Sequence, residues 1–248
     1  MLTVGGQQKN PIYKRYLCDR GWRTTEKSAT KREHTATALS APFLKYWGCM
    51  KKEEAIRIIC SCAKNYQTNL ENRNLLFLFA GDSSVQSFET VFLPRHFLHL
   101  TGAKVEGMSS VHFYNLCIDN KLSYDTFSFA PDGTTVMKLD VLPQLTCIHT
   151  TAKMVGDYNN SKSNLYTKKL SGSVTACLGF AIDESGYYVP NTALKEDIRG
   201  LTTKAHRILA IYSKYTDDDK YQAVSYLAKG IKLSELVLPQ NVATKINK

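Results

Sequence analysis

The most constraining feature of this sequence is a series of short apolar segments in its last third. Residues 165–170, 174–182, 186–189 and 207–212 each have the length of a β-strand, and Gly, Ser, Asn or Asp bounds each of them. They are rich in β-branched and aromatic residues, and the connections between them are mostly short. These segments predict antiparallel strands that follow one another along the chain.

The preceding part of the chain is mainly helical in its pattern. Apolar residues recur at helical spacing over 51–69 and 109–118, and again over 136–151, where Pro143 is expected to interrupt the helix. Two apolar runs, 75–79 and 85–93, flank a turn-like segment and predict a hairpin. Residues 124–129 look strand-like or extended, and 219–229 has a helical pattern that ends at Gly230. Helices followed by strands indicate the α+β class.

Residues 1–49 have a different character, with scattered basic residues and no sustained periodicity. Two interpretations stay open: a disordered basic arm, or a leader that is not genuinely translated, since Met50 opens directly into a helical pattern. We expect one domain over 50–235 and a tail over 236–248.

The net charge of the whole chain is +10, but nine Lys and Arg against three Asp and Glu before Met50 leave only +4 for the remainder. The charge favours an acidic partner, with nucleic acid the commonest candidate.

The seven cysteines are odd in number and have no framework spacing, since Cys60 and Cys62 are separated by a single residue. They predict free thiols and therefore a reducing compartment. No apolar run has the length of a membrane span, and the N-terminus lacks the apolar core of a signal peptide. We therefore expect a cytoplasmic protein without a membrane partner.

Residues 91–102 concentrate reactive side chains at the end of a predicted strand. Pro94 suits the first position of a helix, and Gly102 suits its end. His96 and His99 would then lie on one helical face, close to Arg95. The alternative is that both histidines are core residues among Phe and Leu neighbours, and the sequence leaves this open.

Several classes of site have no motif here. The sequence contains no GxGxxG, no P-loop lysine and no GxSxG, and His96 and His99 lack the further ligands of a zinc site. We therefore predict neither a cofactor nor a metal. The His, Arg, Lys, Thr and Tyr side chains at strand ends suit metal-free RNA cleavage, which needs a base, an acid and cations on the phosphate.

Two later stretches supply similar side chains. In 166–172, Thr167 and Lys169 would share one strand face, and Tyr166 and Lys168 the other. The alternative for this stretch is an edge strand guarded by lysines. Residues 189–199 mix a turn with polar groups, and the favoured alternative for them is ordinary turn chemistry with a helix cap.

Four of these stretches, in their order along the chain, carry a family resemblance. They are FLHLTG at 97–102, LYTKKLSG at 165–172, LGF at 178–180 and VPNTALKEDIR at 189–199. They resemble the fourth division of the phage-associated barnase–EndoU–colicin–RelE-like nucleases, found in bacteria and their mobile elements. The similarity covers roughly 93–214 and leaves 1–49 outside.

The resemblance implies an α+β fold in which N-terminal helices pack on a four-stranded antiparallel sheet that binds RNA. It also implies a metal-independent ribonuclease that acts as a toxin or in phage–host conflict. His99 and Thr101 match best, Tyr166, Thr167 and Lys168 match the first strand after the helices, and Asn191, Asp197 and Arg199 match the last motif.

The leading hypothesis is an endoribonuclease that cleaves single-stranded RNA, with tRNA one candidate, to a 2′,3′-cyclic phosphate, with an inhibitor protein as a further partner. The alternative is a non-catalytic RNA- or protein-binding module on the same fold. The predicted catalytic residues are His99, Thr101, Arg95, Lys168 and Arg199, and the predicted RNA-binding residues are His96, Tyr166, Thr167, Lys169 and Asn191.

Overall fold

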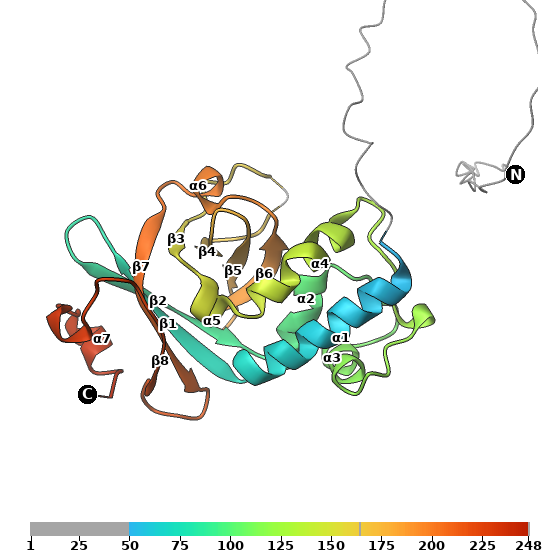
Figure 1. Ribbon diagram of the computed structural model, residues 1–248, viewed down its shortest axis with the longest axis horizontal. Helices are drawn as coiled ribbons and strands as arrows, with labels where there is room; N and C mark the ends of the chain where they lie inside the picture. Colours follow the sequence, from blue (N-terminus) through green and yellow to red (C-terminus); the bar gives the residue numbers. More distant parts are fainter. Residues whose placement is uncertain (1–49, 164, 248) are drawn as a thin grey trace, which may run out of the picture. The chain divides into compact units, whose positions relative to one another are not determined.

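The computed structural model describes residues 50–163 and 165–247, which belong to one compact unit (Figure 1). The interpretation of residues 1–49 as a disordered or untranslated leader lies outside the described residues. None of the helices in the described part of the chain combines the length and apolar character needed to cross a bilayer.

The strands of the described residues form one mixed eight-stranded sheet, in the order β1-β2-β6-β5-β4-β3-β7-β8. β1 also pairs with β7, so that the ladder from β1 to β7 closes on itself. The pairing of β2 with β6 is parallel and consists of one bridge, Thr90 with Tyr188, whereas the other pairings are antiparallel. The strands are β1 (Arg73–Ala80), β2 (Val85–Phe92), β3 (Met154–Asp157), β4 (Lys169–Gly172), β5 (Cys177–Ile182), β6 (Tyr188–Leu194), β7 (His206–Tyr215) and β8 (Ala223–Leu227).

The predicted four-stranded antiparallel sheet under N-terminal helices is therefore wrong, although the α+β class fits the fold overall. The cause is the hairpin of β1 and β2, which joins the sheet instead of standing beside it. Residues 75–79 of β1 are all buried, so this strand needs cover on both faces and partners on both edges. It finds these partners in β2 and β7.

α1 and α4 lie next to each other on one side of the sheet (Figure 1), and α4 packs against β6. The helices are α1 (Lys52–Asn69), α2 (Phe97–Thr101), α3 (Ser110–Ile118), α4 (Thr134–Leu145), α5 (Ile148–Thr151), α6 (Ile198–Leu201) and α7 (Gln240–Ala243), with 3₁₀ turns η2 (Pro94–His96), η3 (Tyr124–Thr126) and η4 (Leu233–Glu235). The buried face of α1 meets Leu75, Phe77 and Phe79 of β1 in the main core.

A second, smaller core lies on the other face of β1, because successive side chains of a strand point to opposite faces. Its members are Leu76, Leu78, Ala210, Tyr212, Tyr221, Val242 and Ile246. The last two belong to the C-terminal segment, residues 231–247, which carries α7. This second core therefore attaches the end of the described chain to the centre of the sheet.

Two predicted helical features differ from the structure. Residues 219–229 were expected to be helical, but 223–227 form β8, which pairs with β7. β7 is long enough for one of its edges to pair with β3 at Arg207 and with β8 from Ala210 onward, and this tertiary pairing overrides the local helical spacing. Pro143 lies inside α4, two residues before its end, and the predicted helical stretch is interrupted after it, at residues 146–147 between α4 and α5.

Candidate active site

Residues 94–101, called here the histidine turn, pack against the main core. Tyr66 of α1 packs edge-on against Phe92 and Phe97, and its hydroxyl donates to the carbonyl of Leu93 at 2.9 Å. The predicted helix begins as η2 and continues as α2, and it ends at Gly102, whose φ is 66°. A left-handed residue at this position is the usual way to end a helix, and glycine adopts it without strain.

The two histidines of the turn differ in environment. His96 is buried, and its Nδ1 accepts a hydrogen bond from the backbone N–H of Leu93 at 3.2 Å. Burial, with Arg95 and His99 nearby, lowers the pKa of His96 to about 4, so its imidazole is neutral at neutral pH. His99 is exposed, and partial burial of the ring together with Lys138 lowers its pKa as well. Of the two, His99 is the one that a substrate can reach.

Arg95 connects the histidine turn to the β5–β6 connection. Its guanidinium lies 3.9 Å from the carboxylate of Asp183. One oxygen of that carboxylate accepts from the backbone N–H groups of Ser185 and Tyr187, both at 3.0 Å. Asp183 thus stabilises the tight turn of residues 183–187, and the same carboxylate contacts Arg95.

Thr101 and Lys138 support the turn from inside. Thr101 is fully buried, and its hydroxyl donates to the carbonyl of Leu98 at 2.8 Å and accepts from the N–H of Ala103 at 3.0 Å. The ammonium of Lys138 on α4 donates to the carbonyl of His99 at 2.7 Å. Burial and nearby Lys104 lower the pKa of Lys138 to about 8. These contacts place Thr101 in the interior, away from the surface that His99 occupies.

The predicted residues before β4 are brought together with Asn191 of β6. The hydroxyl of Thr167 lies 3.2 Å from Oδ1 of Asn191, and Nδ2 of Asn191 donates to the carbonyl of Tyr166. Thr167 is buried, whereas Tyr166 is 70% exposed. The ammonium of Lys168 lies 5.9 Å from the centre of the Tyr166 ring, at the surface. Tyr166 and Lys168 are therefore open to a ligand, and Thr167 and Asn191 fix the backbone beneath them.

Lys169 and Arg199 are both ion-paired. Lys169 binds Asp157 of β3, and its ammonium lies 6.0 Å from the centre of the Tyr188 ring. Arg199 binds the carboxylate of Asp197 through two nitrogens, and Asp197 also caps the start of α6. Arg199 is thus tied to its own helix, whereas Lys169 faces a pocket.

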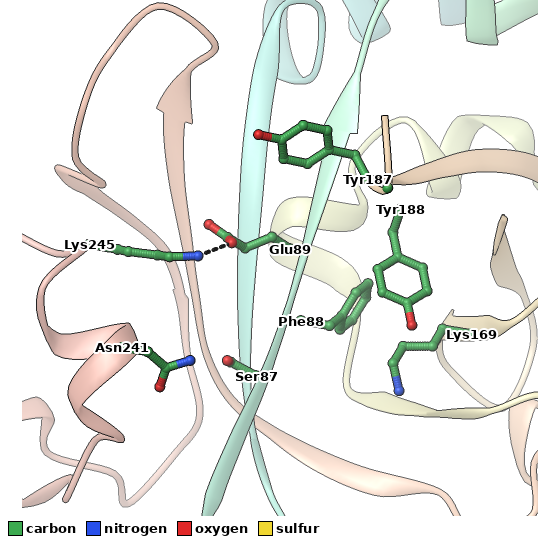
Figure 2. Close-up of a pocket in the computed structure, with 9 residues that line it drawn as sticks. Ser87, Phe88, Glu89, Lys169, Tyr187, Tyr188, Asn241 and Lys245 are labelled. Carbon is green, nitrogen blue, oxygen red and sulfur yellow. Dashed lines mark hydrogen bonds and ion pairs between the residues drawn. The ribbon is translucent and has the colours of Figure 1, made fainter. Parts of the chain in front are cut away.

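The pocket opens where β2 and β6 diverge from their single bridge, and its volume is about 380 Å³. Figure 2 shows the aromatic side chains of Phe88, Tyr187 and Tyr188 on one side, with Lys169 below Tyr188, and Lys245 opposite them. The remaining lining residues are Ser87, Glu89, Gly186 and Asn241. Tyr187 is 51% exposed, so the pocket offers an accessible aromatic ring beside cations.

Glu89 of β2 is the central charge of this pocket. One carboxylate oxygen accepts from the hydroxyl of Tyr221 at 3.0 Å, and the other binds the ammonium of Lys245. Burial and the Glu89 carboxylate raise the pKa of Tyr221, which therefore stays protonated as the donor. Among residues 50–163 and 165–247, no three His, Cys, Asp or Glu side chains are grouped so that they could hold a metal ion.

A family model matches residues 58–230, and its description is phage-Barnase-EndoU-ColicinE5/D-RelE like nuclease4. The chain belongs to this nuclease family. No curated protein and no solved structure matches the chain. The resemblance seen in the sequence motifs is confirmed, and membership of a nuclease family implies a nucleic acid as the substrate.

The sequence of this nuclease did not single out most of the pocket. Tyr187 and Tyr188 were seen only as part of a strand, Glu89 as part of the hairpin, and Lys245 as part of a tail. A signal was present in the adjacent tyrosines beside Gly186, since residues at loops often carry binding functions. Lys245 had no local signal, because only the folded C-terminal segment brings it to β2.

The arrangement carries side chains of the kinds that bind a phosphodiester. Arg95 and Lys169 are cations of the kind that pair with phosphate oxygens, and the exposed Tyr187 ring is of the kind on which bases stack. His99 supplies an accessible group whose ordinary pKa lies near neutrality. The 183–187 turn joins these parts, because Asp183 contacts Arg95 on one side and positions Tyr187 on the other.

Proposed function

We propose that this nuclease is an endoribonuclease that cleaves single-stranded RNA by attack of the ribose 2′-hydroxyl on the adjacent phosphate. The products would be a 2′,3′-cyclic phosphate and a free 5′-hydroxyl. The observation that carries the proposal is the pocket of tyrosine rings and lysines, joined through the 183–187 turn to Arg95, which precedes the exposed His99 by four residues. These are the side chains that RNA cleavage without a metal requires.

His99 is the proposed general base. Its lowered pKa keeps the imidazole neutral near pH 7, so one ring nitrogen is free to accept the 2′-hydroxyl proton. The 2′-oxygen then bonds to phosphorus, the bond from phosphorus to the 5′-oxygen breaks, and that oxygen takes up a proton from water, while His99 returns its proton to the solvent. Arg95, four residues before His99, is positioned to stabilise the charge on the phosphate. The buried Thr101 would act only by holding the turn.

Binding of the RNA chain is assigned to the remaining predicted residues. Lys169 lies in the pocket, and the exposed Tyr166 and Lys168 offer a second aromatic and cationic contact. Stacking on tyrosine needs an unpaired base, which favours single-stranded over double-stranded RNA. His96 supports the turn from inside through its bond to Leu93. Arg199, held by Asp197, would reach the RNA only after release from that carboxylate.

We place this activity in conflict between phages and bacteria, as a toxin held in check by a cognate inhibitor protein. The support is the phage association stated in the description of the family. tRNA is one candidate substrate, because its single-stranded loops present unpaired bases of the kind that the pocket suits.

The decisive experiment compares matched substrates in the presence of EDTA. Purified protein is incubated with a single-stranded RNA oligonucleotide, and with copies that carry 2′-deoxy or 2′-O-methyl ribose at every position. We expect the RNA to be cut and both copies to remain intact, and end mapping should find cyclic phosphates. Cleavage of the 2′-deoxy copy would contradict the 2′-hydroxyl mechanism. Tight binding without cleavage of any substrate would favour the non-catalytic RNA-binding module.

A further inference from the structure

The C-terminal segment, residues 231–247, lies beyond the part of the chain that the family model matches, residues 58–230. It is nevertheless a fixed part of the fold. Val242 and Ile246 are buried in the second core, and Tyr221 exchanges backbone hydrogen bonds with the segment. Its N–H donates to the carbonyl of Lys245 at 2.8 Å, and its carbonyl accepts from Asn247 at 2.9 Å.

This attachment brings two polar side chains to the pocket. Figure 2 shows Lys245 and Asn241 approaching from the C-terminal segment toward Glu89 and Ser87 of β2, opposite the tyrosines and Lys169. The nuclease part supplies one wall of the pocket and the added segment supplies the other. Lys245 and Lys169 thus stand on opposite sides of the same pocket.

Both lysines are neutralised by carboxylates that are open to solvent. Lys245 binds Glu89, and the exposed fractions of the two side chains are 46% for Lys245 and 25% for Glu89. Lys169 binds Asp157, whose side chain is 68% exposed. Exposed or partly exposed ion pairs contribute little net stability, so an incoming phosphate is able to replace the carboxylate. Releasing Lys245 also leaves Glu89 with its hydrogen bond from Tyr221.

We propose that the C-terminal segment is the second wall of the RNA site, and that Lys245 binds a backbone phosphate next to the nucleotide whose base enters the pocket. The proposal rests on the proposed function for the identity of the ligand as RNA. In the absence of RNA, Glu89 occupies Lys245 and repels phosphate. The segment therefore sets how tightly, and over how many phosphates, the pocket holds a single strand.

The test measures binding separately from cleavage, with a short, fluorescent, single-stranded 2′-O-methyl RNA as the probe. Lys245→Gln should weaken binding roughly fivefold to tenfold, and the slope of log affinity against log salt should fall by about 0.7. Lys232→Gln is the matched control, because Lys232 is an ion-paired lysine of the same segment that does not line the pocket. It should change neither quantity.

Glu89→Gln separates phosphate binding from simple attachment of the segment. It removes the same ion pair but leaves the cation in place, so it should tighten binding about threefold to tenfold. Weaker binding in both variants would show that the pair only holds the segment, and unchanged binding in Lys245→Gln would equally overturn the proposal. A wild-type protein that binds the probe but leaves RNA uncut would remove the proposed function and keep this inference. A wild-type protein that does not bind would overturn both.

Discussion

The guanidinium of Arg95 lies 3.9 Å from the carboxylate of Asp183, and this contact joins two parts of the proposed site. Asp183 also accepts the backbone N–H of Tyr187, the exposed ring of the pocket. The position of Tyr187 therefore depends on the same carboxylate that Arg95 approaches. The relationship gives Asp183 a positioning role without a direct contact to substrate.

Replacing Asp183 should separate its two tasks. Asp183→Asn keeps an oxygen acceptor for the turn but loses the ion pair, whereas Asp183→Ala loses both. We expect Asp183→Ala to lower the free energy of unfolding by about 1 kcal/mol. Its cleavage rate should fall roughly tenfold to a hundredfold, because the side chains it positions would shift. Asp183→Asn should retain most of the stability, and the neighbouring exposed Glu184→Ala should match wild type in thermal melting and RNA cleavage.

Gly179 of β5 is a position where any side chain should disturb the predicted RNA-binding stretch. A Cβ atom there would lie 2.7 Å from Cγ2 of Thr192 and 2.9 Å from the hydroxyl of Thr167, which bonds Asn191. We expect Gly179→Ala to lower the free energy of unfolding by about 1–3 kcal/mol. Gly200→Ala is the control, because a Cβ atom there meets nothing within 4 Å. In denaturant titrations, Gly200→Ala should leave the free energy of unfolding unchanged or raise it slightly.

The sequence predicted those parts of the fold whose signal is local. The helix over 51–69 is confirmed as α1, and the hairpin over 75–93 is confirmed as β1 and β2. The sheet was wrong because its size depends on pairings between distant residues, such as Thr90 with Tyr188 and Leu76 with Tyr212. A strand that is apolar on both faces shows that it is central, but it does not identify its neighbours.

The same limit applies to the candidate site. The histidine turn was visible because Pro94, His99 and Gly102 stand close together in the sequence. The pocket was not, because Glu89, Tyr187 and Lys245 meet only through the sheet and the C-terminal segment. The spacing of His96 and His99 also could not show that the first is buried and the second exposed, because their exposure depends on how the turn packs.

The buried His96 should make stability depend on pH. Its folded pKa of about 4 lies below its ordinary value of 6.5, so between these values the unfolded chain binds more protons. The contribution of neutral His96 to the free energy of unfolding is on the order of 3 kcal/mol. It is complete above pH 6.5 and is lost as the pH falls toward 4. His96→Asn keeps an acceptor for the N–H of Leu93 but does not titrate. Equilibrium unfolding at several pH values should show that the free energy of unfolding depends less on pH in this variant than in wild type. An identical pH dependence in both proteins would contradict the role given to His96.

His99 provides the sharpest test of the proposed chemistry. As a general base it should contribute roughly 10²- to 10⁴-fold, so His99→Ala should cut RNA at least about a hundredfold more slowly. Affinity for a non-cleavable RNA should hardly change, because contacts to the phosphate backbone dominate it. His112→Ala is the matched control, since His112 is an exposed helical histidine outside the histidine turn and the pocket, and it should retain full activity.

Melting temperature and single-turnover cleavage must be measured on the same preparation of His99→Ala. If His99 served only the fold, its loss would lower the melting temperature, and the remaining activity would follow the folded fraction. The pH profile gives a second readout. Because neutral His99 is the active form, the rate should rise with pH up to its lowered pKa and then level off. In His99→Ala that rising limb should disappear. A folded His99→Ala protein with full activity, or with an unchanged rising limb, would exclude His99 as the base.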